Sequence, residues 1–234
     1  EELSKKFTEM QDDSEVTAGF MWQKTTRESK KYQLRGEILS FIPVEKNVEV
    51  MLVTITNTGR MAQTVTPTAA IPLYGRSADN IRDHRHVTSL LHRIETTDTG
   101  VLVTPTLSFD ERGHQVNHMT YYCVGWSGNG EYAIVKKAEG VKAGTRIEGL
   151  EAVGGLHFSE VTLEPEEECS YLIFTGITED IQEIRNLSKT YTTREMVLEE
   201  LEKTKAYWQE KVNVAYQDRK STRLNSSHPS RSRM

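Results

Sequence analysis

The stretch PLYGRSADNIRDHRHVTSLLHRI, residues Pro72–Ile94, brings together many side chains that can do chemistry. Guanidinium, carboxylate and imidazole groups can hold a metal ion, pair with one another as a structural joint, or hydrogen-bond the hydroxyl and phosphate groups of a ligand. These side chains are Tyr74, Arg76, Asp79, Arg82, Asp83, His84, Arg85, His86, His92 and Arg93.

A metal site is the first possibility for this stretch. His84 and His86 are two residues apart, so on a strand both rings would face one side, and His92 could join them. No cysteine lies nearby, however, and Arg82 and Arg85 would place positive charge beside any cation. We therefore predict no metal and no other cofactor.

Two other interpretations stay open. In the first, the stretch is a structural joint in which Asp79, Asp83 and Glu95 neutralise the arginines and histidines. In the second, Arg, Asp and His side chains hydrogen-bond sugar hydroxyls or phosphate, and Tyr74 offers an aromatic face to a pyranose ring. On the second interpretation the substrate-binding residues are Tyr74, Arg76, Asp79, Arg82, Asp83, His84, Arg85 and His86.

The rest of the chain offers weaker candidates. Carboxylates gather at Asp110-Glu111 and at Glu164–Glu168, in turn-like segments where a solvated charge run is the expected role. Trp22, Trp126 and Trp208 could stack on a sugar, although an isolated tryptophan usually belongs to a core. We find no nucleophile with an adjacent base and predict no catalytic residue.

Short strands are predicted for most of the chain up to Gly176. Val48–Ile55 carries apolar residues on both faces, as expected for a strand between packed layers. Asn57–Arg60 has the composition of a hairpin turn, with Gly59 at positive φ. We predict a large antiparallel β-sandwich over residues 1–176, with further strands at Tyr32–Ile42, Val101–Phe109, Val116–Trp126, Tyr132–Lys137, Val161–Leu163 and Ser170–Gly176. The Gly-punctuated segment Glu139–Gly155 is predicted to be an exposed loop.

Helical patterns replace the strand patterns after Gly176. Thr178 is the predicted cap of a first helix, and Thr192 with Glu195 forms a predicted capping box for a second. Met196, Leu201 and Trp208 fall near one helical stripe. Residues 177–217 are accordingly predicted to be linker helices that lead to a further domain.

The two ends of the chain look incomplete or foreign. The chain opens on Glu1 and not on methionine, so we expect its natural amino terminus to be missing. Asp218–His228 reads DRKSTRLNSSH, which resembles a translated sequencing adapter, and we expect residues 218–234 to be an artefactual, disordered tail.

Composition excludes some partners. The formal net charge is −5, and it is more negative without the mainly basic tail, so a nucleic-acid partner is not expected. No apolar run approaches the roughly 20 residues that span a bilayer, so no membrane partner is expected either. Cys123 and Cys169 lie in apolar strand-like segments and are predicted to be free buried thiols, which favours a reducing, cytoplasmic location.

The quoted stretch, together with VEVMLVTITNTGRMAQTVTPTAAI before it and SFDERGHQVNHMTYYCVGWSGNGE after it, resembles a known family. It is similar to the amino-terminal β-sandwich (supersandwich) domain of the inverting cellobiose phosphorylases, glycoside hydrolase family 94. YGRSADNIRDHRHVTSLLHRI is most similar to the 1,2-β-oligoglucan phosphorylase branch. The resemblance covers roughly Lys31–Val212.

The resemblance implies a parent enzyme that cleaves a β-glucan oligosaccharide with inorganic phosphate and releases α-glucose 1-phosphate, without a metal. In the family the general acid and most of the phosphate site belong to an (α/α)6 barrel, which this chain lacks, and the sandwich shapes the substrate entrance and a homodimer contact. Two alternatives remain: a free-standing carbohydrate-binding sandwich, and the phosphorylase-like region of a β-1,2-glucan synthase.

Overall fold

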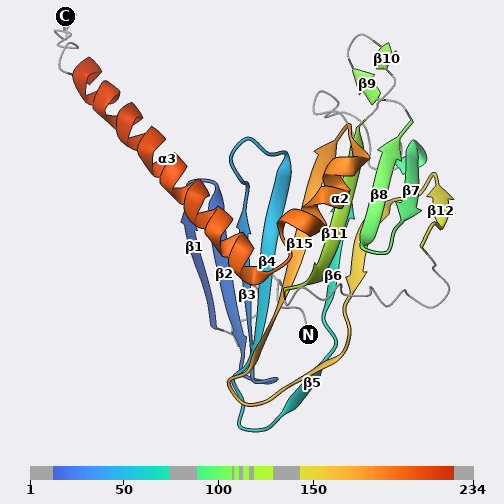
Figure 1. Ribbon diagram of the computed structural model, residues 1–234, viewed down its shortest axis with the longest axis vertical. Coiled ribbons are helices and arrows are strands. Elements are labelled where there is room, and N and C mark those ends of the chain that lie inside the picture. Colours follow the sequence, from blue (N-terminus) through green and yellow to red (C-terminus); the bar gives the residue numbers. More distant parts are fainter. Residues whose placement is uncertain are drawn as a thin grey trace, which may run out of the picture.

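The computed structural model describes residues 13–73, 89–106, 108–110, 113–115, 119–128 and 143–223. Side chains are described over the same ranges except in 108–110, 113–115 and 213–223. The described chain is mainly β, with two helices at its carboxyl end (Figure 1).

One antiparallel sheet of nine strands forms the body of the structure. Its order is β1-β2-β3-β4-β15-β11-β8-β7-β12. The first four strands follow one another along the chain, whereas β15 returns from the far end of the sequence to pair with β4. The strands are β1 (Asp13–Gly19), β2 (Trp22–Ser29), β3 (Leu34–Phe41), β4 (Val48–Asn57), β15 (Glu168–Thr178), β11 (Thr120–Ser127), β8 (Gly100–Pro105), β7 (His92–Thr96) and β12 (Arg146–Glu148).

Three two-stranded ribbons accompany the large sheet. They pair β6 (Thr68–Leu73) with β13 (Ala152–His157), β5 (Gln63–Val65) with β14 (Val161–Leu163), and β9 (Ser108–Asp110) with β10 (Gly113–Gln115). Ribbon β6–β13 packs against β8 and β11, so it supplies a second β layer over part of the sheet. Ala152, Gly154 and Leu156 alternate with outward-facing neighbours along β13 and point into the core.

The opposite face of the sheet is covered by helices (Figure 1). Helix α2 (Ile181–Thr190) and the first turns of α3 (Arg194–Arg223) pack on β15 and β4. The helices bury Ile184, Val197 and Leu201, and Tyr191 at the junction between them is 2% exposed. The fold class predicted from the sequence, an antiparallel β-sandwich followed by helices, is confirmed.

The core therefore has two compartments, one on each side of the large sheet. Paired residues of neighbouring strands share a face, so Phe174 lies on the same side as its partners Val50 and Val124. This helix-side compartment contains stacked aromatic rings: Trp126 on Phe174, with ring centroids 4.6 Å apart, and Phe174 on Tyr191 at 5.5 Å. The other compartment lies under β6–β13, where Phe158 meets Tyr171 at 4.3 Å.

Several element predictions are confirmed. β14 has the predicted bounds, β3 lies within its predicted strand, and β15 extends past its predicted strand at both ends. β8 and β11 overlap the predicted strands Val101–Phe109 and Val116–Trp126 in part. β4 is buried along both faces as predicted, although Met51 and Val53 are only partly covered. The predicted strand at Tyr132–Lys137 lies outside the described residues.

The hairpin predicted at Asn57–Arg60 is wrong. β4 pairs with β3 and β15, whereas the next strand, β5, pairs with β14 in a separate ribbon. Gly59 does not have positive φ. The turn is instead built around the buried Asn57, whose side-chain oxygen accepts the Gly59 N–H at 2.9 Å and whose amide donates to the carbonyls of Met61 and Leu163. Asn57 and Gly59 do form a turn, but this turn leads from the nine-stranded sheet to the β5–β14 ribbon.

The exposed loop predicted at Glu139–Gly155 is also wrong for its described part. β12 pairs with β7 and β13 pairs with β6 within this segment. The glycines that suggested a loop serve other purposes: Gly149 has φ +71, and Gly154 lies so close to Cys123 that an added Cβ would be 2.3 Å from the cysteine Cβ.

The predicted helix starts are each displaced along the chain. Asp180, and not Thr178, caps α2, because its carboxylate accepts the Gln182 N–H at 2.8 Å. Thr178 supports the cap by accepting the N–H of Asp180 at 3.0 Å. α3 begins at Arg194 directly after Thr193, so the predicted box of Thr192 and Glu195 is not formed.

The apolar stripe of α3 and its far end also differ from the prediction. Val197, Leu201 and Thr204 face the sheet, whereas Met196 is 40% exposed. The helix continues to Arg223, so the backbone is helical for the first six residues of the segment that we expected to be a disordered tail.

Candidate functional site

The predicted substrate-binding residues Tyr74, Arg76, Asp79, Arg82, Asp83, His84, Arg85 and His86 all lie outside the described residues. The structure does describe the two points at which the segment that contains them joins the rest of the domain. It leaves ribbon β6–β13 at Leu73, which is 7% exposed, and the described chain resumes at the buried Ser89 before β7. The segment therefore connects the ribbon layer to the large sheet.

The carboxyl end of the same sequence stretch is structural. His92 is 1% exposed, and burial lowers its pKa. A hydrogen bond that the ring donates to the Leu150 backbone opposes this shift in part, but the ring is neutral at pH 7. Arg93 pairs with Glu148 at 3.2 Å, and Glu95 pairs with Arg146 at 3.2 Å.

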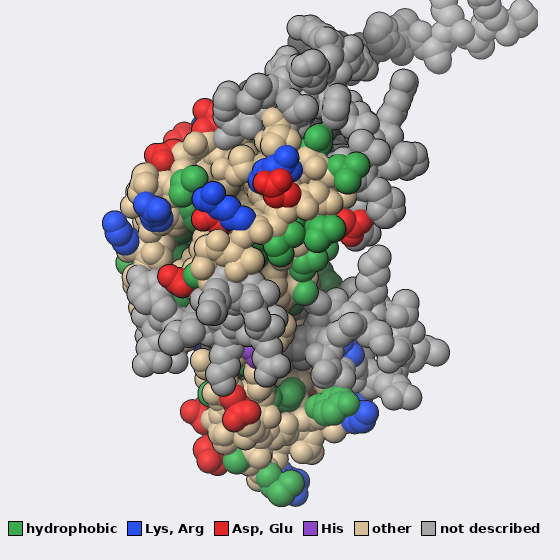
Figure 2. All heavy atoms as spheres, turned by 90° about the vertical axis from the view of Figure 1, so that its right-hand side faces the viewer, with side chains coloured by type: hydrophobic (Ala, Val, Ile, Leu, Met, Phe, Trp, Pro, Cys, Tyr) green, Lys and Arg blue, Asp and Glu red, His purple; other side chains and the backbone are tan. Residues whose placement is uncertain are grey.

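These two ion pairs cross from β7 to β12 at the edge of the sheet. The described end of the stretch is thus tied to β12 by ion pairs, whereas Asp79 and Asp83, the other partners in the structural-joint interpretation, lie outside the described residues. Figure 2 shows that acidic and basic side chains are interspersed on this side of the molecule and do not form a surface of one sign.

Neither cysteine is suited to nucleophilic chemistry. Both are free; Cys123 is fully buried, and burial raises its pKa to about 12. Burial likewise raises the pKa of Cys169, opposed by its hydrogen bond with Tyr171. Both thiols are therefore protonated at neutral pH. The prediction of buried free thiols is confirmed for Cys123, and Cys169 is partly buried.

A polar cluster fastens the helices to the β3–β4 turn. The Lys46 ammonium donates to the Tyr191 hydroxyl at 2.6 Å and lies 3.4 Å from the Glu200 carboxylate of α3. Partial burial opposes the ammonium form, yet the contacts with Tyr191 and Glu200 outweigh it and raise the pKa of Lys46. The indole N–H of Trp126 donates to the Tyr191 carbonyl at 2.8 Å. One tyrosine thus ties the turn, the sheet and both helices together.

The three tryptophans have three different environments. Trp126 is 3% exposed and belongs to the core, as predicted for an isolated tryptophan. Trp22 is partly buried, with the Lys205 ammonium 4.7 Å above its ring. Trp208 lines a surface pocket beside Tyr207. The sequence did suggest a sugar-stacking role for these residues, but it did not distinguish Trp208 from the other two.

Neither a membrane-spanning helix nor a metal-binding cluster is found among the described residues. None of the described helices is both long enough and apolar enough to cross a membrane. Within the same part of the chain, no three His, Cys, Asp or Glu side chains converge on a point where a metal ion could bind.

Comparison with solved structures finds only distant likeness. Two structures of heparinase III, one with methylated lysines, have 10% and 12% sequence identity and TM-scores of 0.36 and 0.37, and each match covers 72% of this chain. A third heparinase III structure has 10% identity and a TM-score of 0.38 over 74% of this chain. The chain spans only about a fifth of the length of these proteins, 21% to 22%. None of the curated proteins matches the chain.

A family model gives a much more extensive match. The model described as "Glycosyl hydrolase 94, supersandwich domain" matches residues 6–194, which include every described strand and α2. The match agrees with the nine-stranded antiparallel sheet, the ribbon layer and the helices on the opposite face. The chain therefore belongs to the glycosyl hydrolase 94 supersandwich domain family.

Proposed function

We propose that this chain is the non-catalytic amino-terminal domain of an inverting β-glucan phosphorylase of the 1,2-β-oligoglucan type. The observation that carries the proposal is the family match over residues 6–194. In this proposal the parent protein is a cytoplasmic homodimer whose substrates are a β-glucan oligosaccharide and inorganic phosphate.

The proposed reaction is a single displacement with inversion. A phosphate oxygen forms a bond to the anomeric carbon as the glycosidic C–O bond breaks, and a carboxylic acid protonates the departing oxygen. The products are α-glucose 1-phosphate and a glucan shortened by one unit. In the family that this chain resembles, that acid belongs to an (α/α)6 barrel, so in this proposal the acid belongs to a separate catalytic domain.

The arrangement of the helices supports a connecting role. α2 and the start of α3 are fixed to the sheet, and α3 then runs past β1–β4 and away from them (Figure 1). A 30-residue helix is about 45 Å long. It is a rigid element through which a sandwich domain could hold a fixed position relative to a neighbouring domain.

We expect this chain alone to release no glucose 1-phosphate from a β-1,2-linked gluco-oligosaccharide and phosphate. The same chain, extended by reading the source DNA onward from Gln217, should release it. Product formation is measured by a coupled phosphoglucomutase assay. Turnover by the chain alone would place the acid within it, and an extended protein without turnover would rule out the phosphorylase proposal. Membrane spans in the extension would instead favour the glucan synthase.

The segment that contains Tyr74 and His86 is proposed to contact substrate in that extended enzyme. Arg82→Ala should then reduce kcat/KM for the oligosaccharide about tenfold or more, because a charged hydrogen bond to sugar or phosphate is lost. The melting temperature of the isolated domain should change little. A large fall in that temperature with unaltered kinetics would show that Arg82 belongs to a structural joint.

A further inference from the structure

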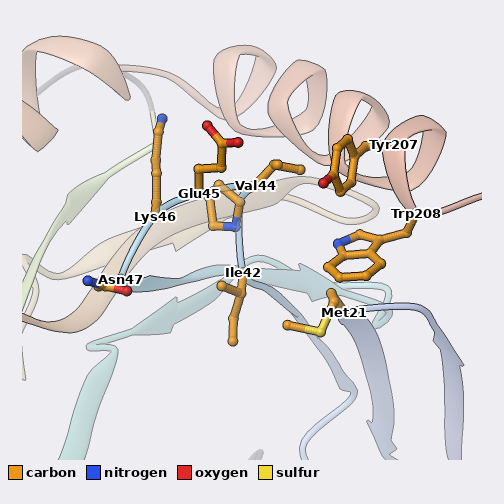
Figure 3. A pocket seen from close by; sticks show the side chains of 9 residues that line it. Met21, Ile42, Val44, Glu45, Lys46, Asn47, Tyr207 and Trp208 are labelled. Carbon is orange, nitrogen blue, oxygen red and sulfur yellow. The ribbon is translucent and has the colours of Figure 1, made fainter. Parts of the chain in front are cut away.

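A pocket of about 310 Å³ opens between α3, the β3–β4 turn and the tip of the β1–β2 hairpin (Figure 3). It is separate from the segment discussed above, since none of its residues falls within 72–94. Its volume lies at the small end of the ~300–1,000 Å³ range of ligand pockets, which suits one sugar ring better than a large cofactor.

Aromatic and apolar side chains form one part of the lining. Trp208 and Tyr207 of α3 meet edge to face, with ring centroids 5.4 Å apart and an interplanar angle of 89°. Met21 lies next to the Trp208 indole, and Ile42 follows it (Figure 3). Met21 is 43% exposed and Ile42 is 39% exposed, so this apolar surface is accessible to a ligand.

Polar side chains form the other part, along the β3–β4 turn. Glu45, Lys46 and Asn47 follow one another there and all are exposed. Within the described part of the chain, the side chains of Glu45 and Asn47 make no hydrogen bond or ion pair. Lys46 uses two of its three N–H groups on Tyr191 and Glu200. Figure 3 shows that the Glu45 carboxylate points toward α3, whereas the Lys46 ammonium is directed at Tyr191 and Glu200, and the Asn47 amide lies at the end of the pocket away from Trp208.

The backbone on both sides of the pocket is held in an uncommon conformation. Met21 has φ 60° and Glu45 has φ 59°, the left-handed region that residues with a side chain seldom adopt. Both residues lie in short turns between strands, where this conformation is common. Here the contacts of Lys46 with Tyr191 and Glu200 fix the turn against α3. The pocket is consequently preformed, which reduces the entropic cost of binding.

We propose that this pocket binds one pyranose unit of a neutral oligosaccharide. The apolar face of the ring would lie on Trp208, and a hydroxyl at the ring edge would hydrogen-bond Glu45. The carboxylate and the ammonium are adjacent, so a neutral polyol suits the site better than a phosphate or a carboxylate. That the sugar is glucose rests on the proposed function.

The test is calorimetric titration of the chain with a β-1,2-linked glucose trisaccharide, in parallel with manno- and xylo-oligosaccharides. We expect saturable binding of the glucose trisaccharide with a Kd on the order of 1 mM. Trp208→Ala should weaken it about tenfold or more, and Trp208→Phe should retain most of it. Glu45→Ala, in an exposed turn, should also weaken it, and this second variant covers the case in which Trp208→Ala does not fold.

Tyr32→Ala is the matched control, because Tyr32 is an aromatic residue that is 40% exposed and lies outside the pocket. Its affinity should equal that of the unaltered chain. The proposal is overturned if no oligosaccharide binds, or if Trp208→Ala and Glu45→Ala bind as the unaltered chain does. Binding of another pyranose without the glucose trisaccharide would support the pocket and count against the glucan phosphorylase. If the extended protein phosphorolyses the glucan but no oligosaccharide binds this pocket, the pocket proposal is refuted and the phosphorylase proposal stands.

Discussion

Phe174→Ala should lower the free energy of unfolding by about 3–5 kcal/mol, the usual range for removing a buried phenylalanine. Phe174 is 0% exposed at the centre of the sheet, stacked between Trp126 and Tyr191. The substitution removes both stacking contacts and leaves a cavity between the sheet and the helix junction. Urea denaturation followed by circular dichroism measures the change.

Phe20→Ala is the matched control for this experiment, because the same atoms are removed from a side chain that is 55% exposed. Its effect should stay within about 0.5 kcal/mol. If the two variants lost similar amounts of stability, the stacked rings could not be the centre of the helix-side core.

Gly154→Ala should destabilise the protein by about 2–3 kcal/mol, in the upper part of the range for overpacked cores. An added Cβ would lie 2.3 Å from the Cβ and 2.6 Å from the sulfur of Cys123. Strand β13 would have to move away from β11, which would loosen the packing of the ribbon layer on the sheet. Thermal unfolding of the purified variant measures the loss.

The neighbouring glycine provides an unusually close control. An added Cβ at Gly155 would meet nothing within 4 Å, because this position faces outward from the same strand. Gly155→Ala should therefore be neutral or slightly stabilising, since alanine restricts the unfolded chain more than glycine does. Equal losses at Gly154 and Gly155 would contradict the close approach of β13 to β11.

The sequence predicted elements well where local pattern and tertiary contacts agree. Val161–Leu163 was predicted with its observed bounds, and the two-sided apolar pattern of β4 matched a strand between two compartments. Prediction failed where a residue that locally favours a turn is used for a contact with a distant part of the chain. Asn57 suggested a hairpin, but its amide is used to hold the carbonyl of Leu163, which is 106 residues away along the chain.

The loop predicted from the glycines of Glu139–Gly155 was wrong for a related reason. Gly154 and Gly155 suggested an exposed loop, yet Gly154 is needed for the close contact between two β layers. Nothing in the local sequence distinguishes a glycine required by packing from one required by a turn. The same limitation applies to the pocket. Trp208 acquires its neighbours Met21 and Ile42 only when α3 packs beside the first strands, and the predicted binding residues of the segment between β6 and β7 stay a prediction.

The position of β15 has a consequence for how the chain folds during synthesis. β1–β4 can pair as soon as they leave the ribosome, but β4 then presents an open edge until β15 arrives, because Val48 pairs with Gly176 and Thr56 with Glu168. More than a hundred residues must be translated in the interval, which takes about 5–20 seconds at elongation rates of about 5–20 residues per second. Closing so long a loop makes this the slow step of folding. The unpaired edge of β4 is meanwhile the surface most open to pairing with another chain, so chaperone dependence should be greatest in the period before Thr178 is made.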